Sequence, residues 1–147
     1  MKRAAVGIKG ADTILLGGIP EGKSVLVSGN CGAGKTIFAA HFAEAGLKKK
    51  EPVVYISLEQ EKEKLLFDLS TIQIDWSKVE KQGLLRIIGG NIASVHSLKE
   101  KRNANIGDLI EEIVDVVKET KAKRVVIDSI NVLLSLFEEN LGVQRHG

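Results

Sequence analysis

Cysteine is almost absent from this chain of 147 residues, in which Cys31 is the only one. A single cysteine excludes an internal disulfide framework and is typical of a reducing compartment. Long apolar runs are also missing, because the longest, near residues 132–137, is far too short to cross a bilayer. The basic amino terminus lacks the apolar core of a signal peptide, so we expect a cytoplasmic protein with no membrane segment.

A charge excess of one sign is missing as well. The chain has 21 Lys and Arg residues against 19 Asp and Glu residues, a net charge of +2. This balance does not indicate nucleic acid as a partner and does not exclude it. Lys99, Lys101 and Arg102 have no aromatic neighbour for base stacking, so we interpret them as a solvated loop. With 44% hydrophobic residues, the sequence predicts one soluble domain over residues 1–147 with a real core.

The most informative stretch has the Walker A pattern G-x-x-x-x-G-K-T of a phosphate-binding P-loop. It consists of Gly29, Asn30, Cys31, Gly32, Ala33, Gly34, Lys35 and Thr36, with Ile37 following. Glycines allow the backbone to approach an anion, and the amides at the start of the next helix point at it. Lys35 is expected to reach the outer phosphates of ATP, and Thr36 to ligate Mg²⁺. Cys31 is interpreted as a filler residue, with a redox switch as the alternative.

Strand-like and helix-like segments alternate along the chain. Apolar and β-branched runs predict strands at residues 25–28, 52–58, 84–88 and 124–127. Residue spacing predicts helices at 11–16, 36–47, 60–70, 106–117 and 130–137. A polar loop of functional length is expected at residues 89–105. The first two strands are expected to pair in parallel through their crossover helix, and the whole pattern is typical of an α/β fold with a mainly parallel sheet.

Two acidic residues follow predicted strands at the edge where such sheets bind ligands. Asp128 ends the strand at 124–127, where a carboxylate would hold Mg²⁺ directly or through water. It could instead cap the segment that begins at Ser129, but the P-loop upstream favours the metal role. Glu59 follows the strand at 52–58 and is a candidate general base for water attack on the γ-phosphate. An equally good interpretation of Glu59 is an acid in the first turn of the next helix.

No further metal site is predicted, because the three histidines have no metal-ligand spacing. They are His41, His96 and His146, and His41 lies among apolar residues of a predicted helix. Trp76 is interpreted as a packing anchor.

Several motifs, in order, resemble those of KaiC-like ATPases, a branch of the RecA superfamily. They are the P-loop and residues 7–12, 16–22, 55–59, Trp76 and 124–129. The resemblance implies a three-layer αβα P-loop core, truncated after the Walker B strand and its helix. It also implies that Glu59 is the catalytic glutamate, that Asp128 is the magnesium-associated aspartate, and that Lys35 and Thr36 contact phosphate and magnesium. Gln60 departs from the family pattern, in which a second acidic residue usually stands at this position.

The family pattern continues beyond this chain. It places a further strand between the P-loop strand and the strand at 124–127, and later strands that supply Lys and Arg to a neighbouring subunit's γ-phosphate. Without that strand the sheet would have a gap with unpaired backbone groups. Three resolutions are open: the chain is a fragment, another chain supplies the strand, or the flanking strands pair directly.

These observations predict an Mg²⁺-dependent ATP-binding domain that hydrolyses ATP weakly and couples ATP or ADP to assembly with copies of itself or a partner chain. An arginine finger contributes roughly 10³–10⁵ in rate, so its loss would spare binding far more than hydrolysis. A regulatory module that binds nucleotide without turnover is one alternative. A DNA recombination or repair ATPase is another, although the family's DNA loops lie mostly beyond this chain.

Overall fold

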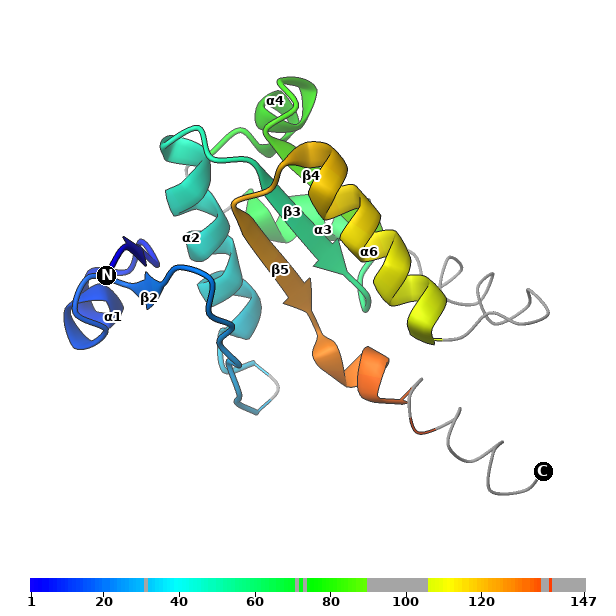
Figure 1. The fold of residues 1–147 in the computed structure, drawn as a ribbon, viewed down its shortest axis with the longest axis horizontal. Helices are drawn as coiled ribbons and strands as arrows, with labels where there is room; N and C mark the ends of the chain where they lie inside the picture. Colours follow the sequence, from blue (N-terminus) through cyan, green and yellow to red (C-terminus); the bar gives the residue numbers. More distant parts are fainter. Residues whose placement is uncertain (31, 71, 73, 90–105, 136–137, 139–147) are drawn as a thin grey trace.

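The computed structural model describes residues 1–30, 32–70, 72, 74–89, 106–135 and 138 (Figure 1). The helices and strands follow the predicted alternation. They are β1 (Arg3–Ala4), α1 (Lys9–Ile14), β2 (Ile19–Pro20), α2 (Lys35–Lys48), β3 (Val53–Ser57), α3 (Lys62–Leu69), α4 (Trp76–Lys81), β4 (Leu85–Gly89), α6 (Ile106–Thr120) and β5 (Arg124–Asp128). Residues 130–135 form a further helical segment. The predicted loop at 89–105 lies outside the described residues, apart from Gly89 in β4.

A three-stranded parallel sheet in the order β4-β3-β5 forms the centre of the fold. In β3, Val53 lies opposite Leu85 of β4 and Arg124 of β5, and the same register continues to Ser57, opposite Gly89 and Asp128. All three carboxyl ends therefore meet at one edge of the sheet. A separate antiparallel pair joins β1 to β2 near the amino terminus.

Helices cover both faces of this sheet and make three layers (Figure 1). On one face, Tyr55 of β3 and Val126 of β5 pack with Ala40 and Ala43 of α2 in a core that also includes residues of α3 and α4. On the other face, a second core joins residues of β3 to those of α6. Because both faces are covered, all five residues of β3 are buried, as is usual for an inner parallel strand.

The predicted strand at 25–28 does not form. The chain at residues 23–30 has no strand structure, and Val25, Leu26 and Val27 are 53%, 73% and 39% exposed. A strand must pair its backbone N–H and C=O groups, and no described strand lies next to this segment. The prediction that 25–28 and 52–58 pair in parallel was therefore wrong. Direct pairing of the flanking strands at 25–28 and 124–127 is not seen either, and β3 pairs with β4 and β5 instead.

The outer edge of β5 is also unpaired within the described residues. Val125 and Ile127 are 39% and 38% exposed, whereas Val126, on the face that α2 covers, is buried. Ile110 and Val114 of α6 are likewise exposed, while Leu109 and Ile113 are buried. Apolar surface is thus left open beside β5.

Arg124 anchors the first residue of β5 although it carries a charge in the core. Its side chain is 2% exposed, and its Nε lies 2.9 Å from Glu51 Oε2. Its Nη1 donates to the carbonyl oxygens of Ala5 and Phe42, and the guanidinium lies 4.7 Å from the centre of the Phe42 ring. A Cβ on Gly46 would lie 2.5 Å from Arg124 Cδ, so the glycine makes room for this side chain.

Trp76 confirms the prediction of a packing anchor. Its side chain is buried, and its Nε1 donates to the carbonyl oxygen of Leu69 at 2.9 Å. The short helix α4 that begins at Trp76 was not predicted. Asp75 begins it as an N-cap, accepting from the amide of Lys78 at 3.0 Å.

Candidate functional site

The amino-terminal end of α2 is open to a ligand. Its N-cap is Gly34, in the left-handed conformation with φ of 91°, and this glycine has no side chain to cap the helix. The first turn also contains no acidic residue. The first amides of a helix have no partner within it, and its dipole adds partial positive charge there. This end of α2 therefore combines backbone donors and positive potential, with no acidic residue in its own first turn.

The loop before α2 brings Lys35 to the same place. Gly29, Asn30, Gly32, Ala33 and Gly34 are exposed. The Lys35 ammonium donates to the carbonyl oxygen of Gly29 at 2.7 Å, so it lies over the loop. Cys31 lies outside the described residues, and Ile37 is 40% exposed one residue past Thr36.

Thr36 and Asp128 meet although they are 92 residues apart in the chain. The Thr36 hydroxyl donates to Asp128 Oδ2 at 2.9 Å. This contact arises because β5 ends at Asp128 beside α2. Helix α2 packs on the face of the sheet to which Val126 and Asp128 belong. The Tyr55 hydroxyl donates to the same oxygen at 3.3 Å. The convergence predicted for the P-loop and Asp128 is therefore present in the structure.

Glu59 lies at the same edge, just beyond β3. Its side chain is exposed and its Oε1 accepts a hydrogen bond from the Ser129 hydroxyl at 2.9 Å. Ser129 also accepts from the amide of Asn131 at 3.2 Å, so it links the end of β5 to Glu59. Glu59 is not within α3, whose first residue is Lys62, so it is not an acid in the first turn of that helix.

Gln60, the departure from the family pattern, has a specific partner. Its Nε2 donates to Asp68 Oδ2 of α3 at 2.9 Å. An acidic side chain at position 60 would place a second negative charge against Asp68, whereas an amide can donate to it. The carbonyl oxygen of Gln60 accepts from the buried Ser57 hydroxyl at 3.3 Å. The local structure therefore suits an amide at position 60, because the amide can donate to Asp68.

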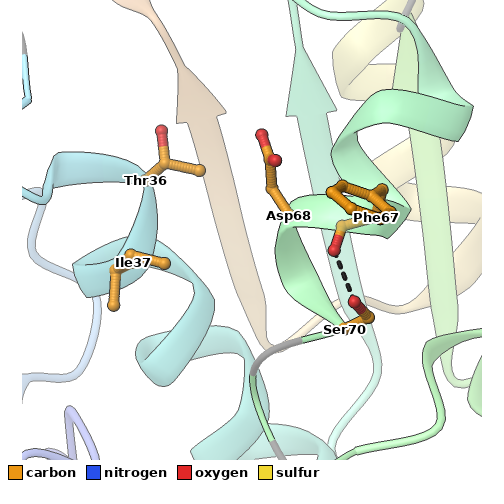
Figure 2. Close-up of a pocket in the computed structure, with 5 residues that line it drawn as sticks. All are labelled: Thr36, Ile37, Phe67, Asp68 and Ser70. Carbon is orange, nitrogen blue, oxygen red and sulfur yellow. Dashed lines mark hydrogen bonds between the residues drawn. The ribbon is translucent and has the colours of Figure 1, made fainter.

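A cavity of about 360 Å³ opens between α2 and α3 beside Thr36. Figure 2 shows Thr36 and Ile37 on one side, with Phe67, Asp68 and Ser70 on the other. The Thr36 hydroxyl and the Asp68 carboxylate point toward the same end of this cavity (Figure 2). The Ser70 hydroxyl donates to the Phe67 carbonyl oxygen and closes the end of α3.

Tyr55, Ser129 and Asp68 touch the site but were not predicted as part of it. Tyr55 and Ser129 lie in segments that gave strand or helix signals and family motifs, but neither residue was singled out. A usable signal was the alternation along β3, because Tyr55 and Ser57 share the face that α2 covers. The polar tyrosine on that face needs a hydrogen-bond partner when buried.

The donor chemistry around Thr36 and Asp128 fits Mg²⁺. A hydroxyl and a carboxylate are the hard oxygen ligands that this ion prefers, and it usually takes few protein ligands besides phosphates and water. In the described part of the chain, no group of three or more His, Cys, Asp or Glu side chains gathers to hold a metal.

None of the helices formed by the described residues is long and apolar enough to span a membrane.

Comparison with known proteins gives a consistent family. A family model described as "ATPase: KaiC" matches residues 4–145. The chain is 37% identical over 139 residues to a UPF0273 protein of Thermotoga maritima, covering 90% of this chain and 57% of the relative. It is 30% identical over 146 residues to the circadian clock oscillator protein KaiC of Parasynechococcus marenigrum, covering 99% of this chain and 28% of the relative.

A solved structure extends the similarity to the fold. The crystal structure of a KaiC-like protein from Pyrococcus horikoshii OT3 matches with a TM-score of 0.73 and 36% identity. The match covers 88% of this chain and 54% of that chain. The chain thus spans a little over half the length of the UPF0273 and KaiC-like relatives described here.

Proposed function

Because this chain belongs to the KaiC family of ATPases, we propose that it binds ATP with Mg²⁺ at the loop before α2. The observation that carries the proposal is the uncapped amino-terminal end of α2. Its first turn contains Lys35 and Thr36, and Thr36 is hydrogen-bonded to Asp128. Such a helix end binds phosphate through its amides and dipole. The matched length of 4–145 contains every residue invoked.

Each residue has a role that follows from its chemistry. Lys35 exchanges its bond to the Gly29 carbonyl for the outer phosphates, because an ammonium gains more from an anion than from a neutral carbonyl. The amides of Gly32 and Gly34 donate to phosphate oxygens, whereas the Ala33 amide donates to the carbonyl oxygen of Asn30 at 3.0 Å. Thr36 and Asp128 hold Mg²⁺, which when bound neutralises charge on the β- and γ-phosphates.

Glu59 is the proposed general base, held at the site by the Ser129 hydroxyl. A base in this position orients and deprotonates the attacking water. The hydrogen bonds that side chains of the described residues make to the carboxylates of Glu59 and Asp128 come from hydroxyls, and none comes from Lys or Arg. An added arginine contributes roughly 10³–10⁵ in rate, so we propose weak hydrolysis by this chain.

A second candidate function is nucleotide binding without turnover. The Gln60–Asp68 hydrogen bond favours it, because a neutral amide stands next to the proposed base. The two functions differ in one measurement. A weak ATPase cleaves bound ATP slowly in a single turnover, whereas a regulatory module releases ATP intact.

We also propose that ATP promotes assembly with a second copy or a partner chain. The apolar side chains of Val125 and Ile127 at the open edge of β5 support this proposal, because exposed edges and apolar patches favour association. Sedimentation velocity with and without Mg·ATP tests it, and a nucleotide-independent monomer would contradict it.

Calorimetric titration of Mg·ATP into the chain tests binding directly. Lys35→Ala should weaken binding roughly 10- to 100-fold, since hydrogen bonds to charged groups contribute about 1.5–3 kcal/mol. Lys49→Ala is the matched control, because it removes the same charge at the opposite end of α2 and should leave affinity unchanged. Equal losses in the two variants, or no binding to folded protein, would reject the proposal.

A further inference from the structure

Tyr55 stands at the centre of the sheet and reaches Asp128. It is the only tyrosine of the chain and the middle residue of β3, and its side chain is 0% exposed. Its register partners are Ile87 of β4 and Val126 of β5. Asp128 lies two residues past Val126 and so shares its face of the sheet, which lets the phenol reach along β5 to the carboxylate.

The phenol and the Thr36 hydroxyl end on one carboxylate oxygen. Tyr55 donates to Asp128 Oδ2 at 3.3 Å and Thr36 donates to the same atom at 2.9 Å. Within the described part of the chain, Asp128 Oδ1 accepts no hydrogen bond from a side chain. The two donors thus differ in surroundings: Thr36 stands at the open cavity, and Tyr55 in the dry core.

The Tyr55 hydroxyl is fixed in place by the packing of its buried ring. Burial raises the pKa of the phenol well above its ordinary value, and the negative charge and hydrogen bond of Asp128 raise it further. The ring packs with Ala40, Ala43 and Val126, so the hydroxyl cannot turn toward solvent.

We propose that Tyr55 is a positioning residue that holds Oδ2 of Asp128 so that the carboxylate keeps its orientation when Thr36 turns its hydroxyl oxygen to a metal ion. This inference rests on the proposed function, because the ion is the Mg²⁺ of bound ATP. Thr36 alone cannot do this, since its hydroxyl is itself an expected ligand. Residues that orient a metal-binding carboxylate usually change metal affinity 10- to 100-fold when they are removed.

The test compares ATP binding with Mg²⁺ and with EDTA in Tyr55→Phe, which keeps the buried ring and removes the hydroxyl. We expect the affinity for Mg·ATP to fall about tenfold and the affinity for metal-free ATP to stay unchanged. Ser57→Ala is the matched control, because it removes a buried hydroxyl of the same strand that donates to Gln60 and not to Asp128. This control should keep the full gain in affinity from Mg²⁺.

A second arm separates positioning from packing. In an Asp128→Asn background, Tyr55→Phe should add no further loss of Mg·ATP affinity, because the carboxylate it orients is gone. In the unmutated protein, the single resonance of ¹³Cζ-tyrosine should shift when Mg²⁺ is added to the ATP complex, and should not shift in Asp128→Asn.

Each outcome decides the matter. Equal losses with and without Mg²⁺, or the same loss in the Asp128→Asn background, would overturn the inference in favour of a packing role. If Tyr55→Phe keeps the full gain in ATP affinity from Mg²⁺ while Lys35→Ala still weakens ATP binding, this inference is overturned and the proposed function stays intact. Absence of ATP binding by the folded, unmutated chain would overturn both.

Discussion

Two short apolar segments of this molecule have similar composition and opposite structures. Val53–Ser57 forms β3, which pairs with strands on both sides and is buried throughout. Residues 25–27, Val-Leu-Val, form no strand and are exposed. Among the described strands, β5 stands between these extremes, because it has a described partner on one side only and its alternate residues Val125 and Ile127 are partly exposed.

The difference teaches that β-branched sequence is a preference and a pairing partner is a requirement. Strand propensity mostly measures packing against cross-strand and same-face neighbours. A segment without neighbours gains no such packing and leaves its amides to water. The number of partners, namely two, one and none, therefore orders β3, β5 and residues 25–27 by burial.

The largest expected contrast between these segments is in amide hydrogen exchange. Amides of β3 should exchange only when the whole domain unfolds, which slows them by roughly 10³-fold or more relative to the unfolded chain. Amides of residues 25–27 should exchange at nearly the unprotected rate. Exchange followed by NMR or by mass spectrometry of peptides measures both. Comparable protection of the two segments would show that residues 25–27 have a partner in solution.

Truncation of one apolar side chain in each segment sharpens the comparison energetically. Ile56→Ala in the buried strand should lower the free energy of unfolding by about 2–5 kcal/mol, because it opens a cavity in the core. Leu26→Ala is the matched control and should cost less than about 0.5 kcal/mol, because the side chain is exposed. Urea unfolding gives both values, and a similar cost at the two positions would break the comparison.

The smallest expected effect is a pH dependence of the unfolding free energy, which reports how well the Tyr55 phenol in the middle of β3 is shielded from water. The pKa of Tyr55 is raised in the folded protein, so the unfolded chain loses its phenol proton first, near pH ~10. The stabilisation is complete below that pH and is lost as pH rises above it, by up to about 1.4 kcal/mol per unit.

Tyr55→Phe isolates this contribution from the lysines that titrate in the same range. Only the unmutated protein should show the additional decline of unfolding free energy between pH 10 and 11, by about 1.4 kcal/mol at most. Parallel urea titrations of the two proteins measure the difference. Identical slopes would indicate that the phenol ionises in the folded state and that water reaches it.

Much of the fold could be predicted from local patterns. Helix α2 was predicted at residues 36–47 and is Lys35–Lys48, and β3, β4 and β5 lie within about a residue of their predicted bounds. The Thr36–Asp128 contact was expected from the rule that parallel strands bring their carboxyl ends to one edge, but the strand before the P-loop does not form. In the structure the contact arises because α2 packs beside β5. The features predicted correctly are those with a strong hydrophobic periodicity or with a position that the sheet topology fixes.

The failures depend on neighbours that are distant in sequence. Residues 25–28 have a strand signal as strong as that of β5, and only the absence of a described partner strand decides against them. The hydrogen bonds of Tyr55 to Asp128 and of Ser129 to Glu59 span 73 and 70 residues, and depend on side-chain reach across two strands. No local window contains that information.

The fit of Arg124 against Gly46 has a consequence for how this family can change over time. A side chain at position 46 would collide with the arginine, and a smaller residue at 124 would lose the ion pair with Glu51 and open a void. Each substitution alone is therefore expected to destabilise the fold, so the two positions should tend to be replaced together. A collection of related sequences should therefore show the arginine and the glycine as an inherited pair.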